Sequence, residues 1–337
     1  MMTEPIGSLS IAASISEASI ASSKIAFIFP GQSSQTVGMG KDLAEKYSIA
    51  RQTFEEADEA LGYKLSEICF AGPEEQLRLT EITQPAILTA SIAALRVFES
   101  YVPKPCLVAG HSLGEYSAHV ASGTMSFADA VRTVRNRGKY MQEAVPVGVG
   151  AMAAILGMEL KEVTAVCEDA AQGEVCAPAN INSPEQIVIS GNTAAVERGA
   201  KLAGERGAKR AMLLQVSAPF HCSLMKPAQD RLEADLNKLK MQKPAYPVVC
   251  NVEASLVSDE LRARETLVAQ VTGAVKWEQC MRVLIGNGMQ TFVEIGPGKV
   301  LCGLMRQIDR PKTCVNVGDE ASLAKALAQF EGLAKSS

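Results

Sequence analysis

The sequence predicts an α/β fold in which a small α+β subdomain is inserted into a larger domain. Short apolar runs that stop at glycine or proline alternate with stretches of helical periodicity, which is typical of a parallel sheet covered by helices. Between residues 145 and 215 the order becomes strand, helix, two strands, helix and strand, which is typical of a ferredoxin-like unit. The chain of 337 residues is long enough for both parts.

Composition limits the class of protein. The net charge of -4 argues against nucleic acid as the main partner, and no apolar run approaches the ~20 residues of a membrane span. The nine cysteines include no CxxC pair and no Cys/His cluster at metal spacing. We therefore expect reduced, mostly buried thiols, no metal, and a reducing compartment such as the cytoplasm.

Residues 1–23 form a serine-rich start of the chain. They contain seven serines and no lysine or arginine. We expect a disordered N-terminal segment that carries no secretory signal. The alternative is the remnant of a transit segment, which would place the protein in a plastid or in the mitochondrial matrix.

The larger domain is expected to span residues 24–144 and 216–310. It begins with a buried strand at 25–29, which ends at Pro30 and continues into the polar loop 32–40. Loops at this end of a parallel sheet often contact ligands, although a plain turn into a helix is the alternative. Scaffold helices are predicted at 41–61, 84–101 and 127–144.

The central feature is the segment 107–122, LVAGHSLGEYSAHVAS. An apolar strand breaks at Gly110-His111-Ser112-Leu113-Gly114 and the chain continues as a helix. Glycines on both sides of a serine allow a sharp strand-to-helix turn that exposes the hydroxyl group, as in a nucleophile elbow. This GxSxG pattern is common, so by itself it is also compatible with an ordinary turn serine.

The inserted subdomain is expected at residues 145–215. Its predicted elements are a strand at 152–156, a helix at 160–171, strands at 176–182 and 186–190, a helix at 193–206 and a strand at 210–215. The larger domain then continues with a helix at 224–240, a strand at 248–252, a helix at 259–271, a segment at 277–287 and a strand at 291–295. Residues 311–337 are expected to form a C-terminal extension of one strand and one helix.

A serine nucleophile needs a base within hydrogen-bond reach and N–H donors for the oxyanion. His221, at a predicted break between a strand and a helix, is the candidate base for Ser112, with a capping or core histidine as the alternative. The backbone N–H of Leu113 and the loop at Gln32 are the candidate oxyanion donors. No acid precedes His221 in an evident loop, so the order of residues differs from that of common α/β-hydrolases.

Six motifs carry a more specific signal: FPGQSSQTVGMG, GHSLGEYSA, RNRGKYMQEAVP, NSPEQIVISG, APFHCSLMKPA and EIGPGKVL. In this order and spacing they resemble the malonyl-CoA:acyl carrier protein transacylase family, over residues 24–309. The resemblance implies an α/β-hydrolase-like large domain with the inserted ferredoxin-like subdomain. It also implies a ping-pong transfer of malonyl from coenzyme A, through a malonyl-serine, to the phosphopantetheine thiol of acyl carrier protein. Such an activity supplies fatty acid synthesis and uses the coenzyme A thioester as a substrate, without a cofactor.

The resemblance also implies roles for single residues. Ser112 matches the acylated serine, and His221 matches the base. The main-chain carbonyl of Gln270 matches the group that orients the histidine. The backbone N–H groups of Gln32 and Leu113 match the oxyanion donors.

Arg137 matches the arginine that binds the malonyl carboxylate. A planar guanidinium group binds a carboxylate bidentately, which suits a malonyl thioester independently of the resemblance. The alternative for a cation on this helix is a solvated face. Leu113 and Phe220 resemble the malonyl-selective pattern. Ser33 departs from the family, which usually has glycine there, and a positive φ at this position would strain the loop by ~1 kcal/mol.

Acyl carrier proteins are acidic, so an acidic enzyme needs a local basic surface to bind one. We expect this surface on the inserted subdomain, where solvated helix charges are the alternative. The four candidate residues are Lys201, Arg206, Lys209 and Arg210.

Two other functions remain open. A serine thioesterase or esterase would use the same nucleophile and release the acyl group to water. A scaffold that binds acyl carrier protein without catalysis is disfavoured, because the serine, the histidine and the arginine are all present.

Overall fold

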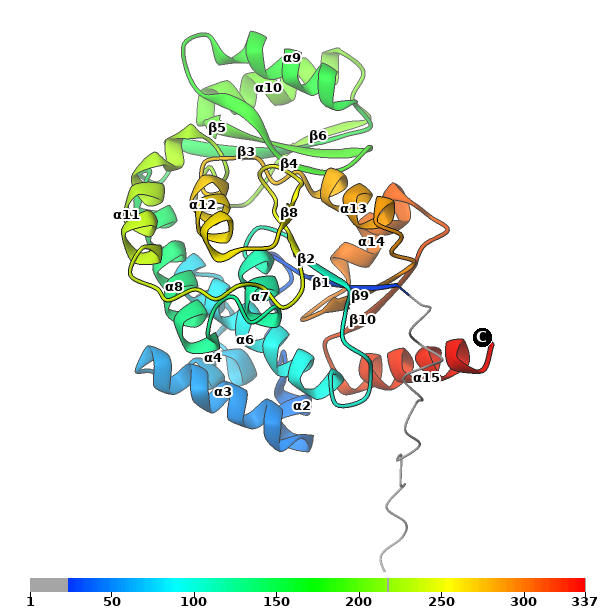
Figure 1. The fold of residues 1–337 in the computed structure, drawn as a ribbon. Helices are drawn as coiled ribbons and strands as arrows, with labels where there is room; N and C mark the ends of the chain where they lie inside the picture. Colours follow the sequence, from blue (N-terminus) through cyan, green and yellow to red (C-terminus); the bar gives the residue numbers. More distant parts are fainter. Residues whose placement is uncertain (1–23, 217, 337) are drawn as a thin grey trace, which may run out of the picture.

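The computed structural model describes residues 24–216 and 218–336, so the prediction for residues 1–23 lies outside the described part (Figure 1). A six-stranded sheet has the order β10-β9-β1-β2-β7-β8. Its strands are β1 (Ile25–Phe29), β2 (Leu107–Gly110), β7 (Val248–Val249), β8 (Leu256–Val257), β9 (Thr291–Ile295) and β10 (Thr313–Val317). All neighbours are parallel except β7 and β8, which pair antiparallel. The predicted α/β architecture with a parallel sheet is confirmed.

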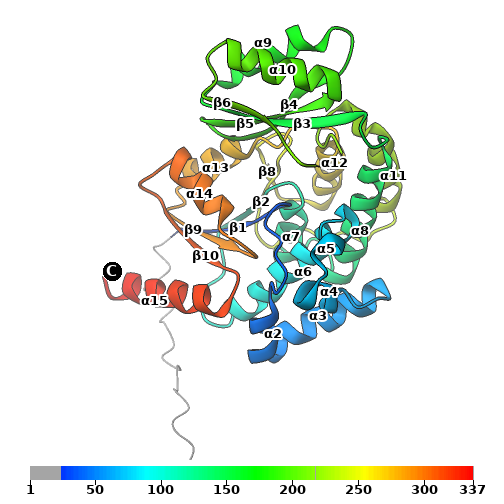
Figure 2. The ribbon, with the colours of Figure 1, turned by 180° about the vertical axis from the view of Figure 1, so that it is seen from behind.

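A second sheet lies at one end of the molecule and is entirely antiparallel (Figures 1 and 2). Its order is β4-β5-β3-β6, and its strands are β3 (Gly150–Leu156), β4 (Cys176–Ser183), β5 (Gln186–Asn192) and β6 (Arg210–Leu213). The helices α9 (Leu160–Ala171) and α10 (Thr193–Glu205) cover its outer face, where they share a core with Ile155 and Ile189. The opposite face, with Met152 and Val188, joins the core of the large sheet.

The central strand β1 explains why its sequence is an uninterrupted apolar run. Phe27 and Phe29 face one core, whereas Ala26 and Ile28 face the other, and all four are fully buried. Both faces of the sheet must therefore be covered by helices. One face carries α13 (Trp277–Gly286) and α14 (Val300–Ile308).

The other face of the large sheet has the larger core. Its helices are α2 (Lys41–Lys46), α3 (Ser48–Leu61), α4 (Leu65–Ala71), α5 (Glu74–Leu77), α6 (Thr80–Phe98), α7 (Gly114–Ala121), α8 (Phe127–Glu143), α11 (Lys226–Leu236), α12 (Glu260–Gln270) and α15 (Glu320–Ser336). The residues expected as a C-terminal extension supply β10, an edge strand of the large sheet, together with α15.

Several predicted boundaries were wrong. The helix expected at 41–61 is divided into α2 and α3, because Tyr47 adopts an extended backbone between them. The strand expected at 248–252 ends at Val249, where the chain turns back so that the N–H of Cys250 donates to the carbonyl of Ser255. The helix expected at 224–240 ends at Leu236, and the short helices α4 and α5 were not predicted.

The expectation that all cysteines are reduced is wrong for one pair. Cys302 on α14 and Cys314 on β10 form a disulfide, with Cα atoms 5.3 Å apart. No CxxC spacing indicated this pair, because the turn from α14 into the parallel strand β10 brings the two residues together. The other seven cysteines are free, and five of these are buried, as expected. Among the described residues, no helix has an apolar stretch long enough to cross a bilayer.

Glu294 on β9 supports the start of α14 from inside the protein. Its carboxylate is fully buried and accepts hydrogen bonds from the backbone N–H groups of Leu301, at 3.0 Å, and Cys302, at 2.8 Å. Burial raises the pKa of Glu294 to about 7. The two oxygens therefore satisfy two donors that would otherwise lack partners at the helix terminus.

We predict that Glu294→Gln lowers the free energy of unfolding by about 2 kcal/mol, because the amide NH2 group cannot accept and one buried N–H loses its partner. Urea denaturation at a pH above the pKa of Glu294 measures this change. The exposed Glu59→Gln is the control and should leave the midpoint unchanged. Equal midpoints for Glu294→Gln and the wild-type chain would contradict the assigned role.

Candidate active site

Ser112 lies at the tip of the sharp turn between β2 and α7. Its φ of 51° is in the left-handed region. A Cβ atom on Gly110 would lie 1.9 Å from the main chain of Gly114, and one on Gly114 would lie 2.1 Å from the carbonyl oxygen of Phe29. The two glycines are therefore required for close approach of the backbone. The predicted sharp turn from strand to helix at Ser112 is confirmed, and its shape is that of a nucleophile elbow.

His221 lies within hydrogen-bond reach of the Ser112 hydroxyl group. Its Nε2 lies 2.7 Å from Ser112 Oγ, and its Nδ1 lies 3.0 Å from the main-chain oxygen of Gln270. Because a carbonyl only accepts, Nδ1 carries the hydrogen and Nε2 is left to accept from the serine hydroxyl. Burial, and secondly the charge of Arg137, lower the pKa of His221 to about 3, so the ring is neutral near pH 7.

Arg137 brings a buried positive charge to the nucleophile. The side chain is 1% exposed, and its Nη2 donates to Ser112 Oγ at 3.1 Å and to Gln270 Oε1 at 3.0 Å. Its Nη1 donates to Gln84 Oε1 at 2.9 Å, whereas its Nε has no partner. Burial lowers the pKa of Arg137. None of these hydrogen-bond partners is a carboxylate, and a buried cation without one favours binding of an anion beside the serine.

A cavity of about 100 Å³ contains the serine, the histidine and the arginine. Apolar side chains form much of its wall: Met141, Met152, Leu214, Val216 and Phe220. Three of the five come from β3 and from the segment after β6, so both sheets contribute to the cavity. The site therefore combines a serine hydroxyl, a neutral histidine and a buried cation in a small cavity with polar and apolar walls.

The chain is similar to known proteins over most of its length. Residues 26–325 match the family model described as acyl transferase domain. The malonyl CoA-acyl carrier protein transacylase of Escherichia coli (strain K12) is 48% identical over 305 residues, which cover 90% of this chain and 99% of that protein. An acyl carrier protein S-malonyltransferase from Vibrio cholerae is 47% identical, with a TM-score of 0.89 over 90% of this chain and 100% of that one. A malonyl-transacylase solved in complex with a type II PKS acyl-carrier protein is 45% identical, with a TM-score of 0.89 over 91% and 100%.

This chain belongs to the malonyl-CoA:acyl carrier protein transacylase family. The resemblance of its six motifs is thereby confirmed. The motifs also meet in space, because Ser112, Arg137 and His221 come from three of them and line one cavity.

In this member of the transacylase family, two backbone N–H groups near Ser112 are free to donate a hydrogen bond. Leu113 begins the turn into α7, and Gln32 follows β1 and lines the cavity. Within residues 24–216 and 218–336, neither N–H has an acceptor. Both are therefore free to donate, and their role as oxyanion donors stays a prediction.

Gln84, Glu115 and Asn251 were missed by the sequence analysis. Gln84 binds Arg137, and the other two form a polar network beneath the turn. All three are at most 1% exposed. Glu115 lies inside the motif GHSLGEYSA, so the motif held a signal, whereas the contacts of Gln84 and Asn251 depend on the fold.

Three of the four basic residues proposed for carrier binding form surface ion pairs: Lys201 with Glu205, Arg206 with Asp169 and Lys209 with Glu185. Arg210, on β6, is exposed and has no ion pair within the part of the chain that the structure describes. Exposed pairs contribute little to stability, so they leave these cations available to another protein.

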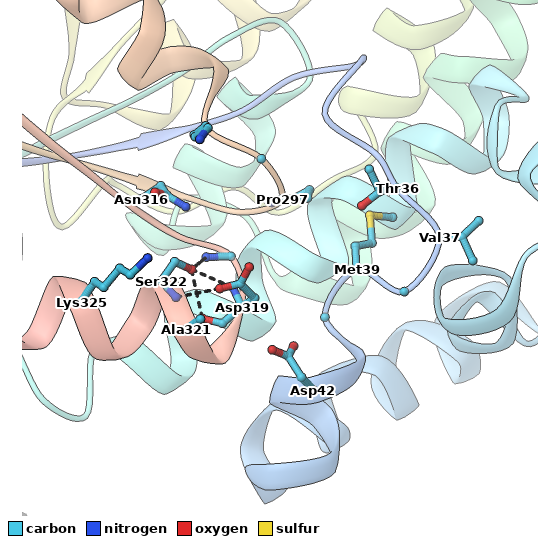
Figure 3. Close-up of a pocket in the computed structure, with 15 residues that line it drawn as sticks. Thr36, Val37, Met39, Asp42, Pro297, Asn316, Asp319, Ala321, Ser322 and Lys325 are labelled. Carbon is cyan, nitrogen blue, oxygen red and sulfur yellow. Dashed lines mark hydrogen bonds between the residues drawn. The ribbon is translucent and has the colours of Figure 1, made fainter.

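A second and larger hollow, of about 570 Å³, lies beyond the ends of β9 and β10, near the start of α15 (Figure 3). Asp42, Asn316 and Ser322 are part of its wall. It shares no lining residue with the cavity that holds Ser112. In the described residues, no group of three His, Cys, Asp or Glu side chains is arranged to hold a metal ion.

Ser33 has a φ of 80°, which is the left-handed conformation considered from the sequence. The residue is exposed, and its N–H donates to Gln35 Oε1 at 2.8 Å. A side chain in this conformation costs about 1–2 kcal/mol. The loop beside the cavity therefore carries backbone strain.

We predict that Ser33→Gly raises the free energy of unfolding by about 0.5 kcal/mol, because the relieved strain exceeds the extra entropy that glycine gives the unfolded chain. Denaturant unfolding measures the change. Ser33→Ala keeps Cβ and is the matched control, which should show no gain. A glycine variant less stable than the alanine variant would disprove the strain.

Proposed function

We propose that this protein transfers a malonyl group from malonyl-CoA to the phosphopantetheine thiol of acyl carrier protein, through a malonyl ester of Ser112. One observation carries the proposal: the buried guanidinium group of Arg137 lies 3.1 Å from the serine oxygen. A cation at this distance suits an acyl group that ends in a carboxylate. The names of the relatives, at up to 48% identity, support the same activity.

In the first half-reaction His221 Nε2 takes the proton of Ser112, and Oγ attacks the thioester carbonyl. The oxyanion that forms accepts hydrogen bonds from the N–H groups of Gln32 and Leu113. When the carbon–sulfur bond breaks, the histidine returns the proton to the coenzyme A thiolate. The products are free coenzyme A and malonyl-serine.

In the second half-reaction His221 takes the proton of the carrier thiol. The sulfur attacks the ester carbonyl, the bond to Ser112 Oγ breaks, and the histidine protonates the serine. The apolar wall that includes Phe220 favours attack by a thiol over attack by water. The reaction uses the coenzyme A thioester as a substrate and needs no cofactor, because protein groups supply the base, the oxyanion donors and the carboxylate ligand.

For the organisation of the chain we propose an α/β-hydrolase-like large domain of residues 24–144 and 216–310, interrupted by a ferredoxin-like subdomain at 145–215. The sheet order β4-β5-β3-β6, with two helices on one face, supports the second description. The location in the cytoplasm stays a prediction from the cysteines, with a plastid or the mitochondrial matrix as the alternative.

Intact mass after incubation with malonyl-CoA tests the proposed chemistry. We predict a malonyl adduct on the wild-type chain and none on Ser112→Ala. Arg137→Ala should lower the rate of malonyl loading by about 10- to 100-fold, because a charge-assisted pair with the carboxylate is lost. Loading from acetyl-CoA, which lacks the carboxylate, should fall much less.

Other outcomes would favour the other functions. Release of coenzyme A without an adduct or a carrier thiol would support a thioesterase or esterase. Failure to form an adduct with malonyl, acetyl or methylmalonyl thioesters would support a binding scaffold. An equal loss of malonyl and acetyl loading in Arg137→Ala would contradict the carboxylate role.

For the carrier surface we predict that the double variant Lys209→Glu, Arg210→Glu raises the KM for acyl carrier protein about fivefold, because two attractive charges become repulsive. The KM for malonyl-CoA should not change. Arg78→Glu reverses an exposed arginine that directly follows α5 and is the control. An unchanged KM for acyl carrier protein would exclude this surface.

A further inference from the structure

We propose that Glu115 and Asn251 are positioning residues, which hold the nucleophile, the base and the carboxylate-binding arginine in a single arrangement. The proposal rests on the proposed function for the identity of the substrate. The hydrogen bonds that carry it position Ser112 whatever the acyl donor is. Both residues are fully buried. Neither lines the cavity, so they act through other groups.

Asn251 fixes the backbone of the nucleophile turn. Its Oδ1 accepts from the N–H of Ser112 at 2.7 Å, and its Nδ2 donates to the carbonyl of Gly110 at 2.8 Å. These two bonds hold the chain on both sides of His111. The left-handed conformation of Ser112 is costly and persists only where its surroundings enforce it, and Asn251 supplies that enforcement.

Gln270 connects the three functional groups. Its main-chain oxygen accepts from His221, its Oε1 accepts from Arg137, and its Nε2 donates to the carbonyl of Ser112 at 2.9 Å. The orientation of the amide therefore matters. If it were reversed, the NH2 group would face the guanidinium group and neither could accept.

Glu115 selects the correct orientation of this amide. Its Oε2 accepts from Gln270 Nε2 at 2.7 Å and from the N–H of Asn251 at 3.0 Å. A carboxylate only accepts, so it holds the NH2 group on its own side and leaves Oε1 for Arg137. Oε2 of Glu115 thus positions both Asn251, which holds the turn at Ser112, and Gln270, which binds His221.

The charge of Glu115 adds a dependence on pH. Burial raises the pKa of Glu115 to about 7. The charge of Arg137 from α8 opposes this shift, and the charge of Glu115 adds to burial in raising the pKa of Tyr116 on α7, Cys250 after β7 and Cys280 on α13. Protonation weakens both hydrogen bonds to Oε2, so serine acylation should rise as the pH increases through about 7. His221 is already neutral in this range, so the base does not produce this step.

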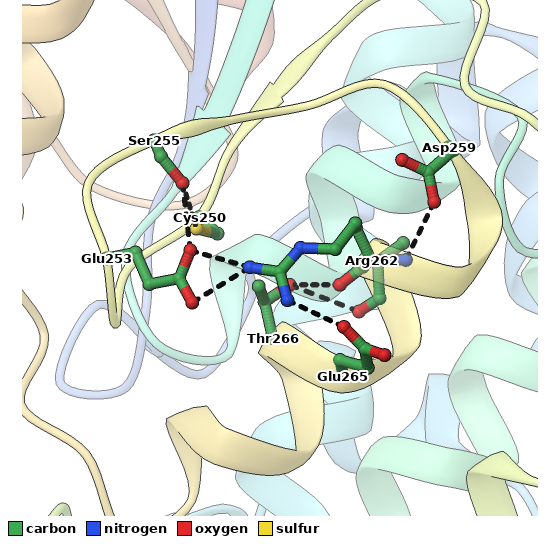
Figure 4. A network of polar contacts seen from close by, with 8 residues as sticks. Cys250, Glu253, Ser255, Asp259, Arg262, Glu265 and Thr266 are labelled. Atoms are coloured by element: carbon green, nitrogen blue, oxygen red, sulfur yellow. Dashed lines mark hydrogen bonds and ion pairs between the residues drawn. The ribbon is translucent and has the colours of Figure 1, made fainter.

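A separate polar network on the solvent side joins the loop after β7, which contains Asn251, to α12, which ends at Gln270 (Figure 4). Arg262 on α12 donates to both oxygens of Glu253, at 2.8 and 2.7 Å, and to Glu265 at 2.6 Å. It ties the loop after β7 to α12 but makes no contact with the nucleophile turn. Arg262→Gln is therefore a matched control: it loosens the contact between this loop and α12 without changing a hydrogen bond to the turn at Ser112.

The test compares Glu115→Ala, Glu115→Gln, Asn251→Ala and Arg262→Gln. Two rates are measured over a range of pH: single-turnover loading from malonyl-CoA, and modification of Ser112 by a fluorophosphonate, which needs no acyl donor. We expect both rates to fall about 10- to 100-fold in the alanine variants, as for a displaced catalytic group. Arg262→Gln should stay within about twofold of the wild-type rates.

Glu115→Gln keeps one acceptor oxygen and cannot ionise. We expect it to fold, to react at every pH at about the rate of the protonated wild-type chain, which is within about threefold of the maximal wild-type rate, and to lose the rise near pH 7. A wild-type pH profile in Glu115→Gln would overturn the proposal, even if the alanine variants failed to fold. Alanine variants that are folded by circular dichroism and react at wild-type rates would also overturn it. If the wild-type chain forms no malonyl adduct but the fluorophosphonate rates fall as expected, the proposed function fails and the positioning role stands.

Discussion

The buried charge of Arg137 is the constraint on which the rest of the site depends. Its guanidinium group is buried, and its hydrogen-bond partners are two glutamine side chains and the serine hydroxyl. These neutral partners satisfy donors without neutralising the charge, and Glu115, whose charge acts on Arg137, lies outside the cavity. The site is therefore suited to an anionic group beside Ser112. Burial first and the same charge second lower the pKa of His221.

Both sheets are needed to enclose this charge. The large sheet places Ser112 after β2 and Gln32 after β1, at the carboxyl ends of neighbouring parallel strands. The antiparallel sheet supplies Met152 from β3 to the wall of the cavity. The two parts are joined by main-chain hydrogen bonds, since the N–H of Ile181 on β4 donates to the carbonyl of Val275. The cavity follows from this junction and not from either sheet alone.

The precision of the site comes from buried polar groups. Ser112 and His221 both have positive φ, a conformation that side chains disfavour. Hydrogen-bond donors and acceptors that lie outside the cavity maintain these conformations. Among them, Gln270 contacts His221, Arg137 and Ser112. The backbone strain lies at the two residues of the Ser112–His221 hydrogen bond. The buried hydrogen bonds of Asn251 and Gln270 offset part of its free-energy cost.

The sequence by itself determined the class of fold, the nucleophile turn and the family. Apart from short elements such as α4 and α5, periodicity identified the elements from 25–29 to 291–295, and GHSLGEYSA placed Ser112 on a turn, because these features depend on local spacing. The motifs contain His221 and Arg137, and the family resemblance implied the role of Gln270, but periodicity and spacing could not have paired these residues. Gln270 lies 158 residues from Ser112, and Glu115 lies 136 residues from Asn251. Only the tertiary structure decided those contacts and the Cys302–Cys314 disulfide, because hydrogen bonds between distant residues depend on side-chain positions that no local pattern records.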